Sequence, residues 1–251
     1  MRAALMGPDE AAVVLRELTV SYRGRVAVHR LSGQFRAGQA TAVIGPNGAG
    51  KSSLLAAVGG LLKGVEGEVL LRSGLRVASL SQVSTLDRSF PIQVRDTVAM
   101  GLWRRIGCFA GVKAEHEQVL QQALAAVGLA GFEWRWMSEL SAGQVQRVLF
   151  ARLMVQDAQL ILLDEPFNAM DARTTADLLA LLARWKDEGR TVVAVLHDLE
   201  QVRQHFDEVL ILAREGVAWG ATASVLTPEH LERARHKAEA WEASQMLCRA
   251  A

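Results

Sequence analysis

Residues 45–53 read Gly45-Pro46-Asn47-Gly48-Ala49-Gly50-Lys51-Ser52-Ser53. The apolar run 41–44 precedes this segment, and helix-forming residues 54–58 follow it. Glycine permits backbone angles, and an approach of the main chain to a ligand, that a Cβ atom would prevent. Successive N–H groups of such a loop can therefore surround a polyphosphate at the positive end of the following helix. The pattern predicts a phosphate-binding loop between a buried strand and a helix.

The polar residues at the end of this loop indicate the ligand. We expect Lys51 to neutralise the β- and γ-phosphate oxygens, and the Ser52 hydroxyl to occupy one position on Mg²⁺. The whole loop, Ser53 included, is then expected to bind a nucleoside triphosphate. A flexible glycine turn with no ligand is the alternative, and it is disfavoured because the strand and the helix on either side match the context of a phosphate loop.

Length and composition limit the class of protein. The 251 residues suggest one large domain, or one with an inserted lobe, and half of them are hydrophobic, which is ample for a core. A formal net charge of +1 gives no reason to expect a nucleic-acid partner. The two cysteines, Cys108 and Cys248, fit a reducing compartment rather than a disulfide or zinc framework. We expect a soluble protein that reaches a membrane through a partner, because no apolar run has the length of a signal core or of a membrane span.

Two extended segments precede the loop. Residues 13–22 and 26–35 predict a short antiparallel β-meander, which turns at residues 37–38 into the strand before the loop. Tyr22, the single tyrosine, ends the first segment. Its ring is suited to stack on an adenine, since aromatic faces match flat bases. Packing at a strand edge is the alternative that this residue alone leaves open.

Gln82 follows the next two predicted strands, residues 68–71 and 77–80. A glutamine after a strand is usually a loop residue. At an edge where the sheet meets phosphate and metal, its neutral amide could instead sense the γ-phosphate through Mg²⁺ or the attacking water.

Residues 83–140 differ in character from what precedes them. Pro91 is expected to open a helical stretch over Val94 to Trp103, and residues 114–127 repeat apolar side chains at helical spacing before Gly128. We interpret this part as a helical lobe inserted into an α/β core. Four large side chains are expected to pack within the lobe or against a partner: Trp103, Trp134, Trp136 and Met137.

Ser141 begins the next predicted helix, whose main body is residues 145–155, with a buried apolar stripe and basic edges at Arg147 and Arg152. Serine is a favourable N-cap, and a cap needs no ligand. The alternative is a second helix start that binds an anion.

Two buried strands then end in polar groups. Residues 160–163 predict a central parallel strand that ends in Asp164 and Glu165. We assign Asp164 to Mg²⁺ and Glu165 to the general base for the hydrolytic water, because adjacent side chains point in opposite directions. Residues 191–196 predict another strand, followed by His197. At the edge where such sheets bind ligands, we interpret His197 as a γ-phosphate contact rather than an ordinary loop residue.

The end of the chain predicts a hairpin and a helix. The hairpin pairs residues 208–213 with 217–221 around a turn at 214–216, and an exposed helix begins near Thr227. A metal site is disfavoured here because the spacing of the candidate ligands matches no known pattern. These candidates are His230, His236 and Cys248.

In this order, the motifs resemble the ATP-binding subunit of ABC transporters over almost the whole chain. The resemblance is carried by Tyr22, 45–53, Gln82, Leu140-Ser141-Ala142-Gly143-Gln144, 160–166, 168–171 and His197. The segment after Leu140 discriminates most, because many other phosphate-loop proteins lack it.

The resemblance implies further roles. Tyr22 is similar to the adenine-stacking aromatic residue, Gln82 to the lid glutamine, and Asp171 to the aspartate that crosses a dimer interface. The signature residues would cap the γ-phosphate bound by the opposite subunit, so that two chains, expected to be identical, close head to tail around two ATP molecules. Neither chain alone would then complete a site. The signature residues are Ser141, Gly143 and Gln144.

The sequence departs from the family pattern at three places. Ala142 stands where glycine is usual, a small change that should still permit close approach to phosphate. Ser53 replaces the usual threonine after the metal-binding serine. Residues 168–170 read Asn-Ala-Met instead of the commoner Ser-Ala-Leu before Asp171, which bears on the geometry of the interface aspartate.

Residues 89–103 and 165–167 resemble the bacterial importers of zinc and manganese. This resemblance is less specific than that of the ATPase motifs. The resemblance implies an ATPase that energises metal uptake through an integral membrane permease, with a periplasmic or extracellular solute-binding protein acting indirectly. Such a subunit lies on the cytoplasmic face of the inner membrane. An importer of iron chelates or other small solutes, an exporter, and a non-transport ABC protein remain as alternatives.

The expected fold is α/β. It has a P-loop NTPase core, a mostly parallel sheet with helices on both faces, an N-terminal antiparallel β-meander and an inserted helical subdomain. The expectation is a single ATPase domain over residues 1–251. Its parts are 13–82 and 157–226 for the core, 83–140 for the helical subdomain, 141–156 for the signature helix and 227–251 for the tail.

Overall fold

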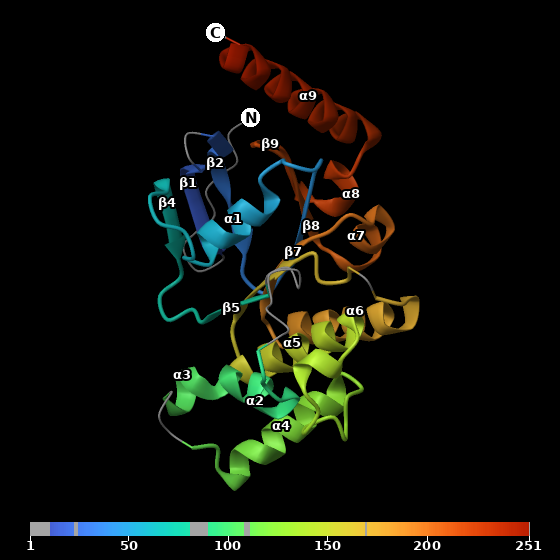
Figure 1. Ribbon diagram of the computed structural model, residues 1–251. Coiled ribbons are helices and arrows are strands. Elements are labelled where there is room, and N and C mark those ends of the chain that lie inside the picture. Colours follow the sequence, from blue (N-terminus) through green and yellow to red (C-terminus); the bar gives the residue numbers. More distant parts are fainter. Residues whose placement is uncertain (1–10, 23–24, 81–89, 108–110, 169, 251) are drawn as a thin grey trace.

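The computed structural model describes residues 11–22, 25–80, 90–107, 111–168 and 170–250, and side chains as far as residue 241. Gln82 lies outside the described residues, so its role as a lid glutamine stays a prediction. The described residues form two sheets with flanking helices, and Figure 1 shows the helices α2, α3 and α4 at the end of the molecule opposite α9.

The larger sheet has the strand order β5-β6-β7-β3-β8-β9 among the described residues. Neighbouring strands are parallel except β8 and β9, which form an antiparallel pair. Every residue of β3, β6 and β7 is buried, which explains why these strands are continuous apolar runs without alternation. The strands are β3 (Ala40–Ile44), β5 (Val77–Leu80), β6 (Leu160–Asp164), β7 (Thr191–Val195), β8 (Glu208–Ala213) and β9 (Glu215–Ala221).

The smaller sheet is antiparallel, in the order β2-β1-β4. It consists of β1 (Ala11–Tyr22), β2 (Arg25–Arg36) and β4 (Glu66–Leu71). The pairing of β1 with β2 shifts register between Leu15 and Leu18, where Glu17 has a φ of 47°. The predicted fold class is confirmed: an α/β chain with a mostly parallel sheet and an N-terminal antiparallel sheet.

The helices near the larger sheet are α1 (Lys51–Val58), α5 (Ala142–Gln156), α6 (Ala172–Asp187), α7 (Leu199–His205), α8 (Thr222–Val225) and α9 (Pro228–Ala250). The intervening lobe contains α2 (Val94–Ala99), η2 (Met100–Leu102), α3 (Trp103–Ile106), α4 (Ala114–Ala126) and the short η3 (Met137–Glu139). The domain boundaries expected from the sequence stay a prediction.

Helix α1 packs between the two sheets. Its Leu54 and Leu55 share one buried cluster with Leu15 of β1 and with Leu162 of β6. The phosphate loop, which leads into α1, is therefore supported by both sheets.

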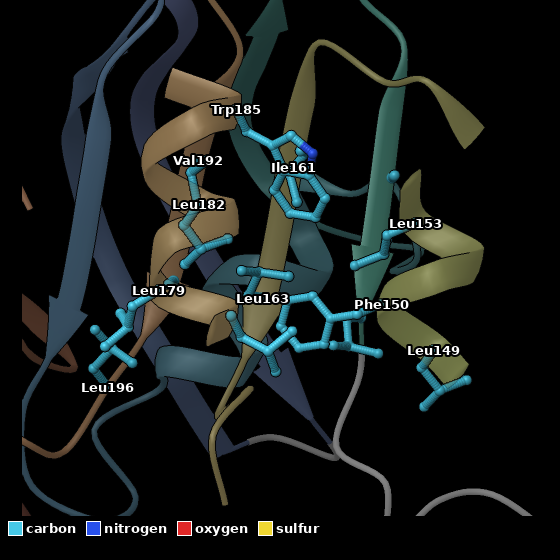
Figure 2. Packing of buried hydrophobic residues seen from close by; sticks show 14 of the residues in the cluster. Leu149, Phe150, Leu153, Ile161, Leu163, Leu179, Leu182, Trp185, Val192 and Leu196 are labelled. Carbon is cyan, nitrogen blue, oxygen red and sulfur yellow. The ribbon is translucent and has the colours of Figure 1, made fainter. Parts of the chain in front are cut away.

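Helices α5 and α6 cover another region of the larger sheet, as Figure 2 shows. Phe150 of α5 is fully buried, and its ring lies 6.3 Å from that of Trp185 of α6, nearly parallel to it. Helix α5 also contacts α2 and α4, so it connects the lobe to the sheet. The signature segment at the start of α5 is thus fixed by a large apolar core.

Two local details concern the lobe and α5. The first lobe helix begins at Val94, the first residue of the helical stretch expected after Pro91, with Gln93 at its N-cap position. Arg152, on the basic edge of α5, is half-buried, and burial lowers the pKa of its guanidinium.

The hairpin turn is shorter than expected. Strand β9 begins at Glu215, so Arg214 is the single residue between it and β8. In the lobe, Met137 is buried, and three tryptophans are exposed: Trp103, Trp134 and Trp136. Of the two expected roles, packing against a partner is the one that remains for these tryptophans.

Replacing Phe150 with alanine should lower the free energy of unfolding by about 3–5 kcal/mol, because the change leaves a cavity between α5 and α6. Chemical denaturation followed by circular dichroism measures the change. Leu61→Ala is the control, since Leu61 is 63% exposed and its loss should cost less than about 0.5 kcal/mol. Equal effects of the two substitutions would contradict the packing of this layer.

Candidate nucleotide-binding site

The predicted phosphate loop lies between β3 and α1. Gly45, Gly48 and Gly50 have φ values of 152°, 76° and 93°, which side-chain-bearing residues rarely adopt. A Cβ atom on Gly45 would lie 2.0 Å from the carbonyl oxygen of Leu212, and one on Gly50 would lie 2.1 Å from that of Ala27. Gly45 and Gly50 are therefore required by close backbone contacts as well as by their dihedral angles, and Gly48 by its dihedral angles alone.

Lys51 lies within the curve of the loop. Its Nζ donates hydrogen bonds to the carbonyl oxygens of Gly45, at 2.9 Å, and Pro46, at 3.0 Å. Burial lowers the pKa of this ammonium group, and the carboxylates of Glu165 and Asp164 act in the opposite direction. The ammonium group of Lys51 and the carboxylates at the end of β6 thus interact electrostatically.

Ser52 and Asp164 form the second contact of the site. The Ser52 hydroxyl donates to Oδ1 of Asp164 at 3.1 Å. Burial raises the pKa of the Asp164 carboxyl, the hydrogen bond from Ser52 lowers it, and neighbouring Glu165 raises it. A hydroxyl and a carboxylate oxygen this close together match the hard oxygen ligands that Mg²⁺ prefers.

Glu165 lies immediately after β6, with a φ of 51°. Its Oε1 is 2.8 Å from Nε2 of His197, and its Oε2 accepts a hydrogen bond from the amide of Asn168. The contact with His197 follows from topology: β6 and β7 are parallel neighbours, so the residues that follow them meet at one edge. Glu165 is mostly buried while His197 is about half exposed, which leaves the pair accessible from solvent.

A cavity of about 780 Å³ extends from the phosphate loop to Tyr22. Residues 47–53 and Glu165 line it, together with residues 25–27 and Arg214. Tyr22 is 45% exposed at its rim, in a position where an aromatic face remains available to a base. The sequence reasoning missed Arg25 and Arg214. The signal for Arg214 was its place in a tight hairpin that follows the strand beside β3.

The signature residues lie elsewhere. Ser141 caps α5: its Oγ accepts from the backbone N–H of Gln144 at 3.3 Å, and its own N–H donates to Oε1 of Gln144 at 2.9 Å. This confirms the expected N-cap. Ser141, Gly143 and Gln144 are not among the described residues that line the 780 Å³ cavity.

Asp171 caps α6 in the same way. It accepts hydrogen bonds from the backbone N–H and the hydroxyl of Thr174, each at 2.8 Å, and these bonds lower the pKa of its carboxyl. Asp171 is exposed, and these hydrogen bonds hold its carboxylate in a fixed orientation at the surface.

The histidines of the tail, at which we expected no metal site, do not line the 780 Å³ cavity. Nδ1 of His230 is 2.8 Å from the carbonyl oxygen of Val225, and His236 is exposed. Within the described residues, no group of three potential ligands among histidine, cysteine, aspartate and glutamate could hold a metal ion. The side chain of Cys248 is outside the described part.

No helix in the described ranges is long and apolar enough to cross a membrane.

The fold and the site together define a class of α/β protein. Its members have a glycine-rich phosphate loop between a central strand and a helix, and acidic residues at the end of a neighbouring strand. A family model described as "ABC transporter" matches residues 28–168. The chain belongs to this family, as an ATP-binding subunit with ATPase activity that works with a membrane transporter complex.

Curated relatives match along most of their length. The chain is 40% identical over 229 residues to the zinc transport system ATP-binding protein of Treponema pallidum, covering 89% of this chain and 86% of the relative. It is 35% identical over 227 residues to the manganese transport system ATP-binding protein of Bacillus subtilis, covering 88% and 91%.

Solved structures agree with the fold. A structure of an ABC transporter of the metal-chelate type, in an inward-facing conformation, matches with a TM-score of 0.79 and 30% identity, covering 90% of this chain and 89% of that one. A nucleotide-free ATP-binding cassette matches with a TM-score of 0.75 and 20% identity, covering 88% and 98%, and supports the fold alone.

Two glycines of the loop provide a matched pair of substitutions. Gly50→Ala places a Cβ atom against the Ala27 carbonyl and should weaken ATP binding by roughly tenfold or more, because the loop must move. Gly48→Ala meets no atom within 4 Å, so it should cost only the left-handed strain of about 1–2 kcal/mol. Isothermal titration with Mg-ATP measures affinity, and thermal unfolding measures the strain. Equal losses of affinity would show that close backbone contact is not what Gly50 provides.

Proposed function

We propose that this chain hydrolyses ATP to energise the import of zinc or manganese through a separate membrane permease. The metal follows from the printed functions of relatives that are 35–40% identical over most of the chain. The observation that carries the catalytic part is the 2.8 Å contact between Glu165 and His197, beside the loop that holds Lys51.

Nucleotide binding is proposed to use the whole loop. Backbone N–H groups of residues 45–53 would surround the phosphates, and the Lys51 ammonium would exchange its bonds to loop carbonyls for bonds to β- and γ-phosphate oxygens. Ser52 and Asp164 would hold Mg²⁺, with Gln82 as a further proposed ligand, and the metal would supply charge neutralisation on the phosphates. Tyr22 would stack on the adenine at the other end of the cavity.

Hydrolysis is proposed to depend on Glu165. Its carboxylate is oriented by His197 on one oxygen and Asn168 on the other, so that the group is fixed before a water reaches it. A carboxylate held this way can accept a proton from the attacking water. His197, at the end of β7 and about half exposed, would contact the γ-phosphate as well as Glu165.

The signature helix is proposed to act on a second copy of the chain. Ser141 and Gln144 form a capping box at the start of α5, a helix of 15 residues whose positive end would favour an anion. These residues do not line the chain's own 780 Å³ cavity in the described structure, which supports a head-to-tail homodimer with two shared sites. Asp171, held rigidly at the surface, would lie at that dimer interface.

The permease is proposed to dock on the lobe. Large aromatic side chains are exposed there, on segments around α2 and α3 and before η3, and exposed apolar groups gathered on one lobe are typical of a protein interface. They are Phe90, Trp103, Trp134 and Trp136. The complex would lie at the cytoplasmic face of the inner membrane, with a solute-binding protein on the far side delivering the metal.

The transported solute can be tested directly. A strain that lacks this chain should lose high-affinity uptake of one of the two metals, and only the intact gene should restore it. The similarity to a metal-chelate type transporter makes an iron chelate the second candidate. Uptake assays with zinc, manganese and a ferric chelate in parallel separate the three, and a defect confined to the chelate would overturn the first proposal.

Glu165→Gln should reduce ATP hydrolysis by about 10²-fold or more while ATP binding persists, because the amide cannot accept the proton from water yet keeps the shape of the side chain. Phosphate release and equilibrium binding of Mg-ATP measure the two properties. Glu188→Gln is a suitable control, since Glu188 follows α6 and bonds Arg184 and Arg190 away from the cavity. Near-normal turnover of Glu165→Gln would contradict the assignment.

Trp103→Ala should leave the ATPase rate of the chain unchanged, because Trp103 is 50% exposed and does not line the 780 Å³ cavity. It should weaken co-purification with the permease by at least about fivefold, since buried aromatic side chains dominate such interfaces. Leu70→Ala, on the smaller sheet, is the exposed apolar control. Unchanged co-purification would place the permease on another surface.

A further inference from the structure

Arg214 connects three parts of the molecule through its backbone. It is the residue between β8 and β9 and has a φ of 60°, which is strained for a residue with a side chain. Its N–H donates to the carbonyl oxygen of Ala49 in the phosphate loop at 2.9 Å. Its own carbonyl accepts from the N–H of His29 in β2 at 2.7 Å. The tip of the hairpin is thus joined to both the phosphate loop and β2.

The side chain of Arg214 makes two further contacts. Its Nη1 donates a hydrogen bond to the carbonyl oxygen of Val26, near the start of β2. Its Cζ lies 5.8 Å from the centre of the Trp241 ring, which belongs to the C-terminal helix α9. Arg214 and Val26 both line the 780 Å³ cavity. One guanidinium group therefore lies between the wall of the cavity and the last helix.

Helix α9 is also held to the hairpin by contacts that do not involve Arg214. Lys237 pairs with Glu215 at 2.8 Å, and Glu215 also contacts His29 at 3.1 Å. The ring of His29 lies 5.8 Å from that of Trp241. Figure 1 shows α9 running past β9 and β2 at the end of the molecule away from the lobe. Trp241 is therefore presented to Arg214 by a helix that is already anchored.

A second cavity places α9 beside the phosphate loop as well. It has a volume of about 260 Å³, and Gly45, Pro46 and His197 line it together with Ala234 and Arg235 of α9. The helix thus borders the loop and the catalytic histidine on one side and, through Arg214, the nucleotide cavity on the other.

We propose that Trp241 positions Arg214, and that Arg214 fixes the start of β2 against the phosphate loop, so that the C-terminal helix contributes to ATP affinity. Arginine is suited to this role because its planar, permanently charged fork can donate hydrogen bonds and stack on an aromatic face at once. The wall that it fixes faces the part of the cavity between the loop and Tyr22, where the ribose and base would lie. The proposal rests on the proposed nucleotide site at residues 45–53.

The size of the expected change in ATP affinity follows from the contact between Arg214 and Trp241. An arginine–tryptophan contact of this kind corresponds to roughly a two- to fivefold change in an equilibrium constant. Trp241→Ala should therefore raise the Kd for Mg-ATP and the KM for hydrolysis by roughly that factor, with kcat retained. Trp241→Phe should restore most of the affinity because it keeps an aromatic face. Isothermal titration of the full chain avoids any optical signal from tryptophan itself.

A double-mutant cycle separates positioning from general destabilisation. If Trp241 acts through Arg214, Trp241→Ala should have no further effect on ATP affinity in an Arg214→Ala background. Glu232→Ala is the matched control, since it changes an exposed residue of α9 and should leave the affinity unchanged. Equal losses from Trp241→Ala in both backgrounds, or an unchanged affinity in the single variant, would overturn the proposal. Lys51→Ala, measured alongside, tests the nucleotide site separately: retained ATP binding there would refute the site itself.

Discussion

The site depends on the parallel alignment of three neighbouring strands, β6, β7 and β3. Asp164 pairs in register with Val195, and Val195 pairs with Val43, so the three strands end at nearly the same level. Whatever follows each strand must then emerge at one edge of the sheet. The phosphate loop follows β3, the carboxylates end β6, and His197 follows β7 by two residues. A backbone hydrogen-bond register, set by buried apolar residues that take no part in chemistry, brings these groups together.

The groups that meet at this edge of the sheet carry an energetic cost. Lys51 and Asp164 are buried. Burial lowers the pKa of the lysine and raises that of the aspartate, which favours the neutral form of each. Glu165 and Arg214 occupy left-handed backbone conformations that cost of order 1–3 kcal/mol each. The apolar layers on either side of the sheet must offset these terms. Three of these residues, Lys51, Asp164 and Glu165, are proposed to handle phosphate, metal and water, so part of the cost lies at the site itself.

Much of this could be predicted from local sequence. Buried parallel strands read as uninterrupted apolar runs, and serine favours the N-cap of a helix, so β6, β7 and the start of α5 were placed correctly. The shared edge of Glu165 and His197 followed from the same reasoning. The contacts of Arg25, Arg214 and Trp241 could not be predicted, because they depend on how a hairpin and a distant helix pack in three dimensions.

The position of α1 has a consequence for how this fold can be divided. An isolated helix of eight residues has little stability in water, and here one buried cluster joins it to both sheets. A fragment that keeps the larger sheet but lacks β1, β2 and β4 would expose one apolar side of that helix and would leave the phosphate loop without a fixed shape. The antiparallel sheet is therefore a necessary support of the phosphate loop, and genetic exchange that separates it from the parallel sheet would remove half of the packing of α1.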